Sequence, residues 1–171
     1  MEEVNIDRLG FSILKVDNIV EVENSYKSRI IVSSNKINSE EAYIRFFNSL
    51  FDIYKEDGFI VDFYINRLTK DEVNSLRSLL CEEDKLTLDK IVEYDLSGEF
   101  FKINSKELID FFVRLSTREV FFISYYTKDF TIWGNYSMRF PIFMESMDKI
   151  QDCFNVLRES ELYLERFIIN K

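Results

Sequence analysis

Histidine is absent from the 171 residues of this chain, and cysteine occurs only twice. Without histidine, Ser-His-Asp and Cys-His nucleophile systems, histidine general bases and histidine-ligated zinc or iron sites are excluded. Cys81 and Cys153 are too few for a disulfide framework or for a structural zinc site within one chain. We therefore expect no cofactor and two free thiols, with Cys153 on the apolar face of a helix. One bridge or one reactive thiol is the alternative.

Glycine and proline are also scarce, with four and one residues respectively. The glycines stand far apart, at Gly10, Gly58, Gly98 and Gly134. Neither a G-x-G-x-x-G turn nor a Walker-type loop can be written, and both need glycine so that backbone amides can approach a phosphate. Nucleotide hydrolysis and dinucleotide-dependent redox chemistry are therefore not expected. No Gly/Ser/Pro-rich linker occurs either, which predicts a single domain over residues 1–171.

The sequence has no apolar run approaching the roughly 18 residues of a membrane span, and it begins Met1-Glu2-Glu3 without the basic and apolar regions of a secretion signal. We therefore expect a cytoplasmic protein. Its net charge is −9 and its pI about 4.7. Such a surface repels phosphate backbones and anionic lipids, so neither nucleic acid nor membrane is expected as a partner. The charge favours a basic protein partner, although solubility alone would also explain it.

Aromatic residues are abundant, with 17 Phe, 9 Tyr and 1 Trp. They recur at helical spacing together with leucine, which predicts apolar helix faces that share one continuous core. The residues expected in this core are Phe46, Phe47, Leu50, Phe111, Phe112, Leu115, Phe154 and Leu157.

Capping signals and apolar spacing predict four helices. Ser39 is typical of a helix N-cap, and that helix should end at Gly58, which can adopt a left-handed conformation. Thr69 and Glu72 have the capping-box pattern that starts a second helix. The other two helices are expected after Asn104 or Ser105 and over residues 147–157, whereas residues 82–90 are ambiguous.

Short β-prone runs bounded by turn residues predict the strands. In the first part of the chain they are expected at 11–16, 19–23, 29–32 and 59–65, with a turn at Asn24 and Ser25 before 29–32. A hairpin is expected from 91–96 and 99–103, joined at Ser97-Gly98. A three-strand meander of 120–126, 130–133 and 136–144 and a last strand at 162–169 follow. Apolar residues on both faces predict that 59–65 is an interior strand. Pro141 cannot donate a ladder hydrogen bond, so its strand is expected at an edge or in a bulge. Together these elements predict an α+β fold, with a mostly antiparallel or mixed sheet and about four helices packed against it.

Carboxylates are the remaining candidates for catalysis. Asp62 falls in the middle of the predicted interior strand, where a buried carboxyl needs an arginine or backbone amides as partners. Structural pairing is the simpler interpretation, and acid–base catalysis is the alternative. Two glutamate pairs, Glu21 with Glu23 and Glu161 with Glu165, would each share a strand face, where a solvated surface is the simpler interpretation.

Aromatic residues also gather in the predicted meander. Trp133 and Tyr136 flank the predicted turn at Gly134-Asn135, with Arg139 close by. Trp, Tyr and Arg dominate the energetics of protein interfaces. We therefore assign Trp133, Tyr136 and Arg139 as candidate partner-binding residues, and packing of this tip on the domain itself is the alternative.

These observations favour a small acidic binding protein that acts by occluding a protein partner. In size, charge and lack of catalytic groups the chain is similar to bacterial immunity proteins, which neutralise toxins in the cytoplasm. The similarity covers no motif and implies no site residues. Two alternatives belong to other classes: an enzyme that uses carboxylates and a divalent metal, and a regulatory module that binds a small apolar ligand in a phenylalanine-lined pocket.

Overall fold

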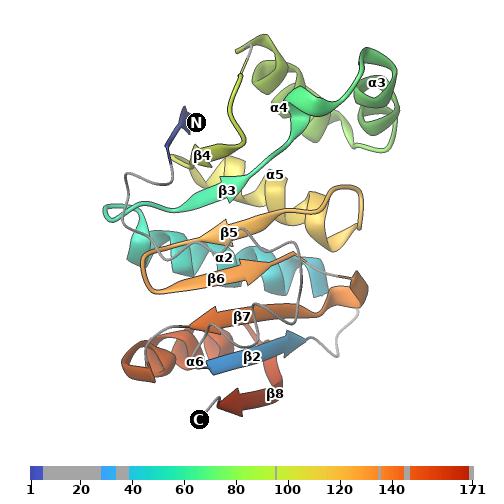
Figure 1. Ribbon diagram of the computed structural model, residues 1–171. Coiled ribbons are helices and arrows are strands. Elements are labelled where there is room, and N and C mark those ends of the chain that lie inside the picture. Colours follow the sequence, from blue (N-terminus) through green and yellow to red (C-terminus); the bar gives the residue numbers. More distant parts are fainter. Residues whose placement is uncertain (6–27, 34–38, 95, 135, 145–146, 170–171) are drawn as a thin grey trace.

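The computed structural model describes residues 1–5, 28–33, 39–94, 96–134, 136–144 and 147–169 (Figure 1). The strands are β1 (Glu2–Glu3), β2 (Ser28–Ser33), β3 (Ile60–Asp62), β4 (Phe100–Lys102), β5 (Ser124–Tyr126), β6 (Phe130–Trp133), β7 (Phe140–Met144) and β8 (Tyr163–Ile169). The α-helices are α2 (Ser39–Tyr54), α3 (Lys70–Ser78), α4 (Glu82–Glu93), α5 (Lys106–Thr117) and α6 (Ile150–Glu159), and the short 3-10 helices are η2 (Ile65–Arg67), η3 (Tyr136–Met138) and η4 (Met147–Lys149). Some sequence predictions lie outside the described residues. These are the strands at 11–16 and 19–23, the turn that follows them, and the glutamate pair Glu21 and Glu23.

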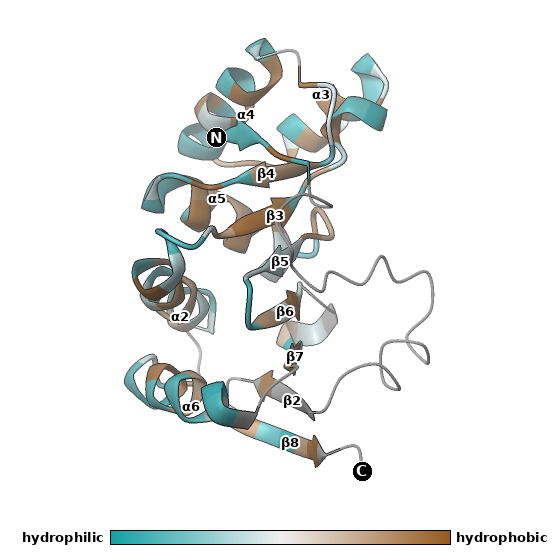
Figure 2. Ribbon diagram, turned by 60° about the vertical axis from the view of Figure 1, so that its left-hand side comes forward, coloured by the Kyte–Doolittle hydropathy of each residue, from teal (hydrophilic) through white to brown (hydrophobic). Residues whose placement is uncertain are grey.

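The described strands form one sheet in the order β1-β4-β3-β5-β6-β7-β2-β8, and every pairing in it is antiparallel. Helices α2, α5 and α6 lie along one face of this sheet, whereas α3 and α4 lie at its β4 end (Figures 1 and 2). The predicted α+β class with helices packed on a largely antiparallel sheet is confirmed. The described chain contains five α-helices, one more than the prediction, because the ambiguous stretch forms α4.

The core lies between the sheet and its helices. Of the eight residues predicted to share it, seven belong to a single buried cluster and Phe154 packs against that cluster while partly exposed. Aromatic rings meet across the layers. Phe47 of α2 lies 4.2 Å from Tyr125 of β5, and Phe63 lies 5.2 Å from Phe112 of α5, measured between ring centroids. Such pairs favour tilted or edge-on geometry, as both contacts show.

Local capping signals operate as predicted. The Thr69 hydroxyl accepts a hydrogen bond from the Glu72 amide at 3.3 Å, and the Glu72 carboxylate accepts one from the Thr69 amide at 2.7 Å. The Ser105 hydroxyl caps α5 by accepting from the Leu108 amide at 3.4 Å. Gly58 has a positive φ of 113°, a conformation that favours glycine, as expected. The helix α2, however, ends four residues earlier, at Tyr54.

The strand predicted at 91–96 is wrong, because Ile91 to Glu93 form the last turn of α4. Asp84, Leu88 and Ile91 fall at helical spacing and all three are buried. Packing on this face overrides the β propensity of the Ile-Val pair at the end of the segment. Phe100–Lys102, by contrast, is a strand that lies between β1 and β3.

Several predicted strands are shorter than expected, and α5 explains one of them. The Leu115 carbonyl at the end of α5 accepts hydrogen bonds from the amides of Val120 at 2.9 Å and Phe121 at 3.3 Å. These bonds hold the first residues of the predicted strand 120–126 against the helix, so β5 begins only at Ser124. The predicted meander is confirmed as β5, β6 and β7, in which η3 delays the start of β7 until Phe140.

The expectation for Pro141 is also wrong, because β7 lies inside the sheet between β6 and β2. The register shift that occurs is elsewhere, between Ile31 and Val32 where β2 pairs with β8. The pairing of β6 with β7 stops at the pair of Ile132 with Ile142, the residue next to Pro141, so Pro141 has no partner in β6. Pro141, which has no amide hydrogen, is therefore accommodated at a position where β7 pairs with β2 but no longer with β6. The interior position predicted for 59–65 is confirmed, since β3 lies between β4 and β5.

Candidate functional site

The segment predicted to bind a partner begins at Trp133, the last residue of β6, and its described side chains contact different parts of the sheet. The Trp133 ring is partly buried and lies 4.8 Å from the Phe143 ring of β7. Arg139 is exposed, and its guanidinium lies 3.0 Å from the Glu165 carboxylate of β8. Tyr136 belongs to η3, and its side chain lies outside the described part of the structure.

This segment is not an open two-residue turn. Ser137 and Met138 have φ angles of 57° and 56°, and the Tyr43 hydroxyl of α2 donates a hydrogen bond to the Met138 carbonyl. The Gly134 amide donates to the Ile123 carbonyl at 2.8 Å. A Cβ at Gly134 would lie only 2.5 Å from that carbonyl oxygen, so this glycine is required for close approach. The segment is therefore tied to α2 and to the chain before β5.

Asp62 is the second candidate from the sequence, and it is buried with 3% of its surface exposed. Its Oδ1 accepts a hydrogen bond from the Ser124 amide at 2.5 Å. Its Oδ2 accepts from the hydroxyls of Tyr64 and Tyr126, both at 3.1 Å. The expected backbone amide is thus present. The two tyrosines take the place of the arginine that was the other expected partner.

Burial dominates the electrostatics of this site. Desolvation raises the pKa of Asp62 to about 6, and the hydrogen bonds from Ser124 and the two tyrosines oppose that shift. Burial, followed by the neighbouring Asp62 charge, also raises the pKa of Tyr64 and Tyr126. A carboxyl that titrates near neutrality can exchange a proton, which is the chemistry that acid–base catalysis requires.

The other carboxylates proposed for catalysis are engaged separately. Glu161 lies before β8 and pairs with Arg45 at 3.0 Å, whereas Glu165 lies in β8 and pairs with Arg139. Each therefore has its own guanidinium, which fits the surface role favoured from the sequence. Within the described ranges, no three His, Cys, Asp or Glu side chains come together as a set of metal ligands.

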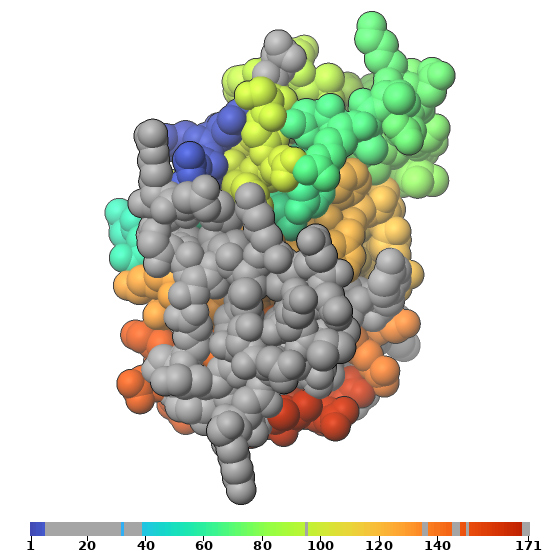
Figure 3. All heavy atoms as spheres, viewed as in Figure 1, coloured from blue at the N-terminus to red at the C-terminus, as the bar shows by residue number. Residues whose placement is uncertain are grey.

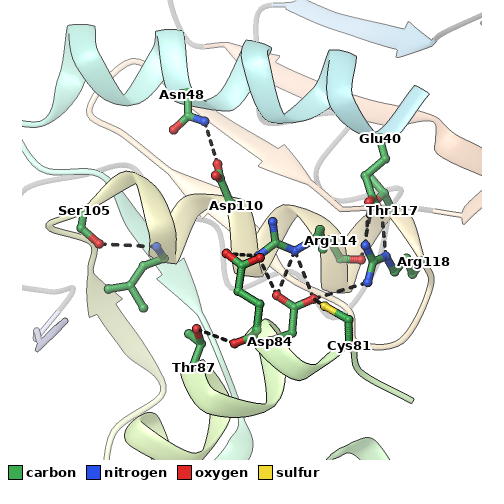
Figure 4. A network of polar contacts seen from close by, with 12 residues as sticks. Glu40, Asn48, Cys81, Asp84, Thr87, Ser105, Asp110, Arg114, Thr117 and Arg118 are labelled. Atoms are coloured by element: carbon green, nitrogen blue, oxygen red, sulfur yellow. Dashed lines mark hydrogen bonds and ion pairs between the residues drawn. The ribbon is translucent and has the colours of Figure 1, made fainter. Parts of the chain in front are cut away.

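A buried carboxylate that sequence reasoning did not single out is Asp84, with 0% of its surface exposed (Figure 4). Its Oδ1 accepts hydrogen bonds from Arg114 Nη2 at 2.6 Å and Nε at 2.9 Å. Its Oδ2 accepts from Arg118 Nη1 at 3.3 Å and from the Cys81 thiol at 3.2 Å. The signal that could have identified it is its helical spacing to Leu88 and Ile91, which places Asp84 on the buried face of α4.

The same arginines connect three helices. Arg118 at the end of α5 also binds the Glu40 carboxylate of α2, at 2.7 and 2.8 Å. This hydrogen bond is the main cause of the raised pKa of Arg118. The Thr117 hydroxyl adds a bond to Glu40 at 3.1 Å. Figure 4 shows this network running from Glu40 on α2 to Asp84 on α4. It therefore fixes α4 to the body of the molecule.

Four exposed apolar residues lie on α4 or next to its ends, and we call them the α4 surface. They are Leu79 (66% exposed), Leu86 (62%), Val92 (45%) and Tyr94 (69%), half of the eight large apolar side chains that are exposed in the described chain. The helices α3 and α4 protrude from the rest of the molecule at the top of Figure 3. Sequence reasoning missed this surface because it treated 82–90 as ambiguous and 91–96 as a strand.

No helix in the described part of the chain combines the length and apolar character needed to cross a membrane. Cys81 and Cys153 are both free, as expected, and Cys153 is buried. Comparisons of the chain with protein-family models, with curated proteins and with solved structures found no match.

Proposed function

We propose that this protein binds another protein in the cytoplasm and acts by covering part of its partner's surface, as inhibitors and bacterial immunity proteins do. The observation that supports this most directly is the α4 surface. Exposed apolar residues that are scattered singly are common on proteins, whereas a group of them in one region is typical of an interaction site. Leu86 and Tyr94 are eight positions apart, about 80° around a helix, so these two lie on the same side of α4. Tyr94 is also of a residue type that is enriched among binding hot spots.

The rigidity of α4 supports the same proposal. On its buried side, α4 is bound to α5 through the ion pairs of Asp84 with Arg114 and Arg118. It is also bound to α3, because Arg77 of α3 donates two hydrogen bonds to Asp89 of α4, at 2.8 and 2.9 Å. A binding surface that is ordered before the partner arrives loses less conformational entropy on binding. We therefore expect α3 and α4 to bind as a preformed unit.

The charges next to the α4 surface favour a basic partner. Glu82 and Glu83 lie in the first turn of α4, and their side chains are 88% and 79% exposed. Glu93 is exposed beside Tyr94 at the other end of the helix. With the net charge of −9, these groups would speed association with a positively charged protein, and salt would slow it.

The test begins by capturing partners from extracts of the source cell with the tagged protein. Affinities for a captured protein are then measured for a Leu86→Ala/Tyr94→Ala variant. We expect a loss of about 2 kcal/mol or more, as for a binding hot spot. Phe122→Ala is the matched control, because Phe122 is an exposed ring outside α3 and α4. Its affinity should equal that of the wild type.

Trp133, Tyr136 and Arg139 provide the second proposed binding surface, and the same assay separates the two. Loss of binding in Trp133→Ala and Tyr136→Ala, with full binding by the α4 variant, would move the interface to the segment after β6. Full affinity in all of these folded variants would rule out both surfaces. If the wild type retains no specific protein, the occlusion hypothesis itself fails.

A further inference from the structure

A groove of about 510 Å³ lies between η2, α3 and the end of α4. Two of the residues that line it, Ile65 and Ile91, are buried. The other residues that line it are Asn66, Leu68, Lys70, Val73, Asn74, Val92 and Leu96. Its volume lies within the range of about 300 to 1,000 Å³ that is typical of small-molecule sites, and aliphatic side chains with a few polar groups are the usual lining. No phenylalanine lines it, unlike the pocket expected from the sequence.

The charge of the lining is opposite to that of the chain. Acidic residues outnumber basic ones by 31 to 22 overall, yet none of the nine lining residues is acidic and Lys70 is basic. Within the described residues, Lys70 forms no ion pair and the side-chain amide of Asn74 has no hydrogen-bond partner. Both groups are therefore available to a ligand at the rim of the groove.

The helix start beside the groove does not itself supply the anion site. The Glu72 carboxylate already accepts the Thr69 amide at 2.7 Å, and the Thr69 hydroxyl accepts the Glu72 amide. The free positive charge at this position is therefore the Lys70 ammonium. Ammonium and amide N–H groups together are donors suited to a carboxylate.

We propose that this groove binds a small organic carboxylate with an apolar body. The carboxylate pairs with Lys70 and Asn74, while the apolar body lies between Leu68, Val73 and Leu96. This inference does not depend on the occlusion of a protein partner. The two sites share only Val92, which belongs both to the α4 surface and to the groove.

Octanoate is the probe, titrated into the full-length protein and followed by amide chemical shifts in NMR. We expect saturable shifts centred on the groove residues. Octanol, which has the same chain without the charge, should bind about tenfold more weakly, equivalent to about 1.4 kcal/mol. Lys70→Gln should weaken octanoate binding by a similar factor. Lys90→Gln is the matched control, because Lys90 is an exposed lysine of α4 outside the groove.

Val73→Trp tests the apolar half of the site, because the indole fills the groove while Lys70 remains. This variant should abolish saturable binding and keep the wild-type pattern of shifts elsewhere in the spectrum. Equal affinity for octanol and octanoate would overturn the proposal. So would equal losses in Lys70→Gln and Lys90→Gln, shifts centred outside the groove, or no saturable binding up to millimolar octanoate.

Discussion

Asp62 and Asp84 are both buried aspartates, but their surroundings differ. Asp84 has two guanidinium groups within hydrogen-bonding distance, from Arg114 and Arg118. Asp62 has a backbone amide and two tyrosine hydroxyls, and none of these carries a positive charge. Burial alone therefore does not decide the role of a carboxyl group. A cationic environment makes Asp84 an ionic link between helices, whereas a neutral polar one makes Asp62 a group that takes up a proton near neutral pH.

The largest effect is expected when the ionic link is broken. Asp84→Asn leaves Arg114, whose side chain is 12% exposed, without its buried anionic partner, and only the exposed Glu83 remains, at 4.0 Å. Removing one member of a buried pair typically costs about 3 to 5 kcal/mol. Urea unfolding should show this loss in the free energy of unfolding, with little change in the slope against urea concentration.

The matched control is Asp89→Asn. Asp89 also pairs with an arginine, Arg77, but their side chains are 42% and 44% exposed. Solvent screens such a pair, so the loss should be much smaller than that of Asp84→Asn. Equal losses in the Asp84 and Asp89 variants would show that burial does not distinguish the two links.

Asp62 is expected to produce the next largest effect, as a pH dependence of stability. Its pKa in the folded protein is about 6, against 3.8 for an ordinary aspartate. Between these pH values the folded state holds a proton that the unfolded chain has lost, so stability falls as the pH rises. The total loss is on the order of 3 kcal/mol, because one pKa unit corresponds to about 1.4 kcal/mol.

Asp62→Asn removes the titrating group and keeps an oxygen that can accept from Ser124. Relative to this variant, the wild type should lose stability between pH 4 and pH 7 in urea unfolding measurements. The variant should equal or exceed the wild type at pH 7.5. Parallel pH profiles for the two proteins would contradict a raised pKa at Asp62.

Much of the fold could be predicted because its signals are local. Thr69 and Glu72 are three positions apart, and their capping box is formed as the sequence indicates. The Phe-rich faces of α2 and α5 follow from the spacing of Phe46, Phe47, Phe111 and Phe112, and all four are buried. Such signals depend on neighbours in the chain, so the sequence alone suffices to read them.

The candidate sites were less predictable because their partners are distant in the chain. Arg114 lies 30 positions from Asp84, and Ser124 and Tyr126 lie 62 and 64 positions from Asp62. The burial of Asp62 could be predicted from its strand, but the identity of its partners depends on the pairing of β3 with β5. The exposed apolar residues of α4 were obscured because residues 91–94, which have β propensity, end the helix.

The smallest expected effect concerns the tyrosines that hold Asp62, and it tests whether the carboxylate is charged in the folded protein. Tyr126→Phe removes a hydroxyl that donates to Asp62 Oδ2 at 3.1 Å. A hydrogen bond to an ionised group contributes about 1.5 to 3 kcal/mol and one to a neutral group about 0.5 to 1.5 kcal/mol. The variant should therefore lose more stability at pH 7.5 than at pH 4.5.

Tyr64→Phe removes the equivalent bond but should cost less than Tyr126→Phe, because Tyr64 is partly exposed and water can replace its hydroxyl. Tyr43→Phe is the control. The acceptors of the Tyr43 hydroxyl are the backbone carbonyls of Val32 and Met138, and backbone carbonyls do not titrate. Its loss should therefore be the same at both pH values. If Tyr126→Phe behaves in the same way, then Asp62 does not change its charge between pH 4.5 and pH 7.5, and acid–base chemistry near neutral pH loses its basis in this site.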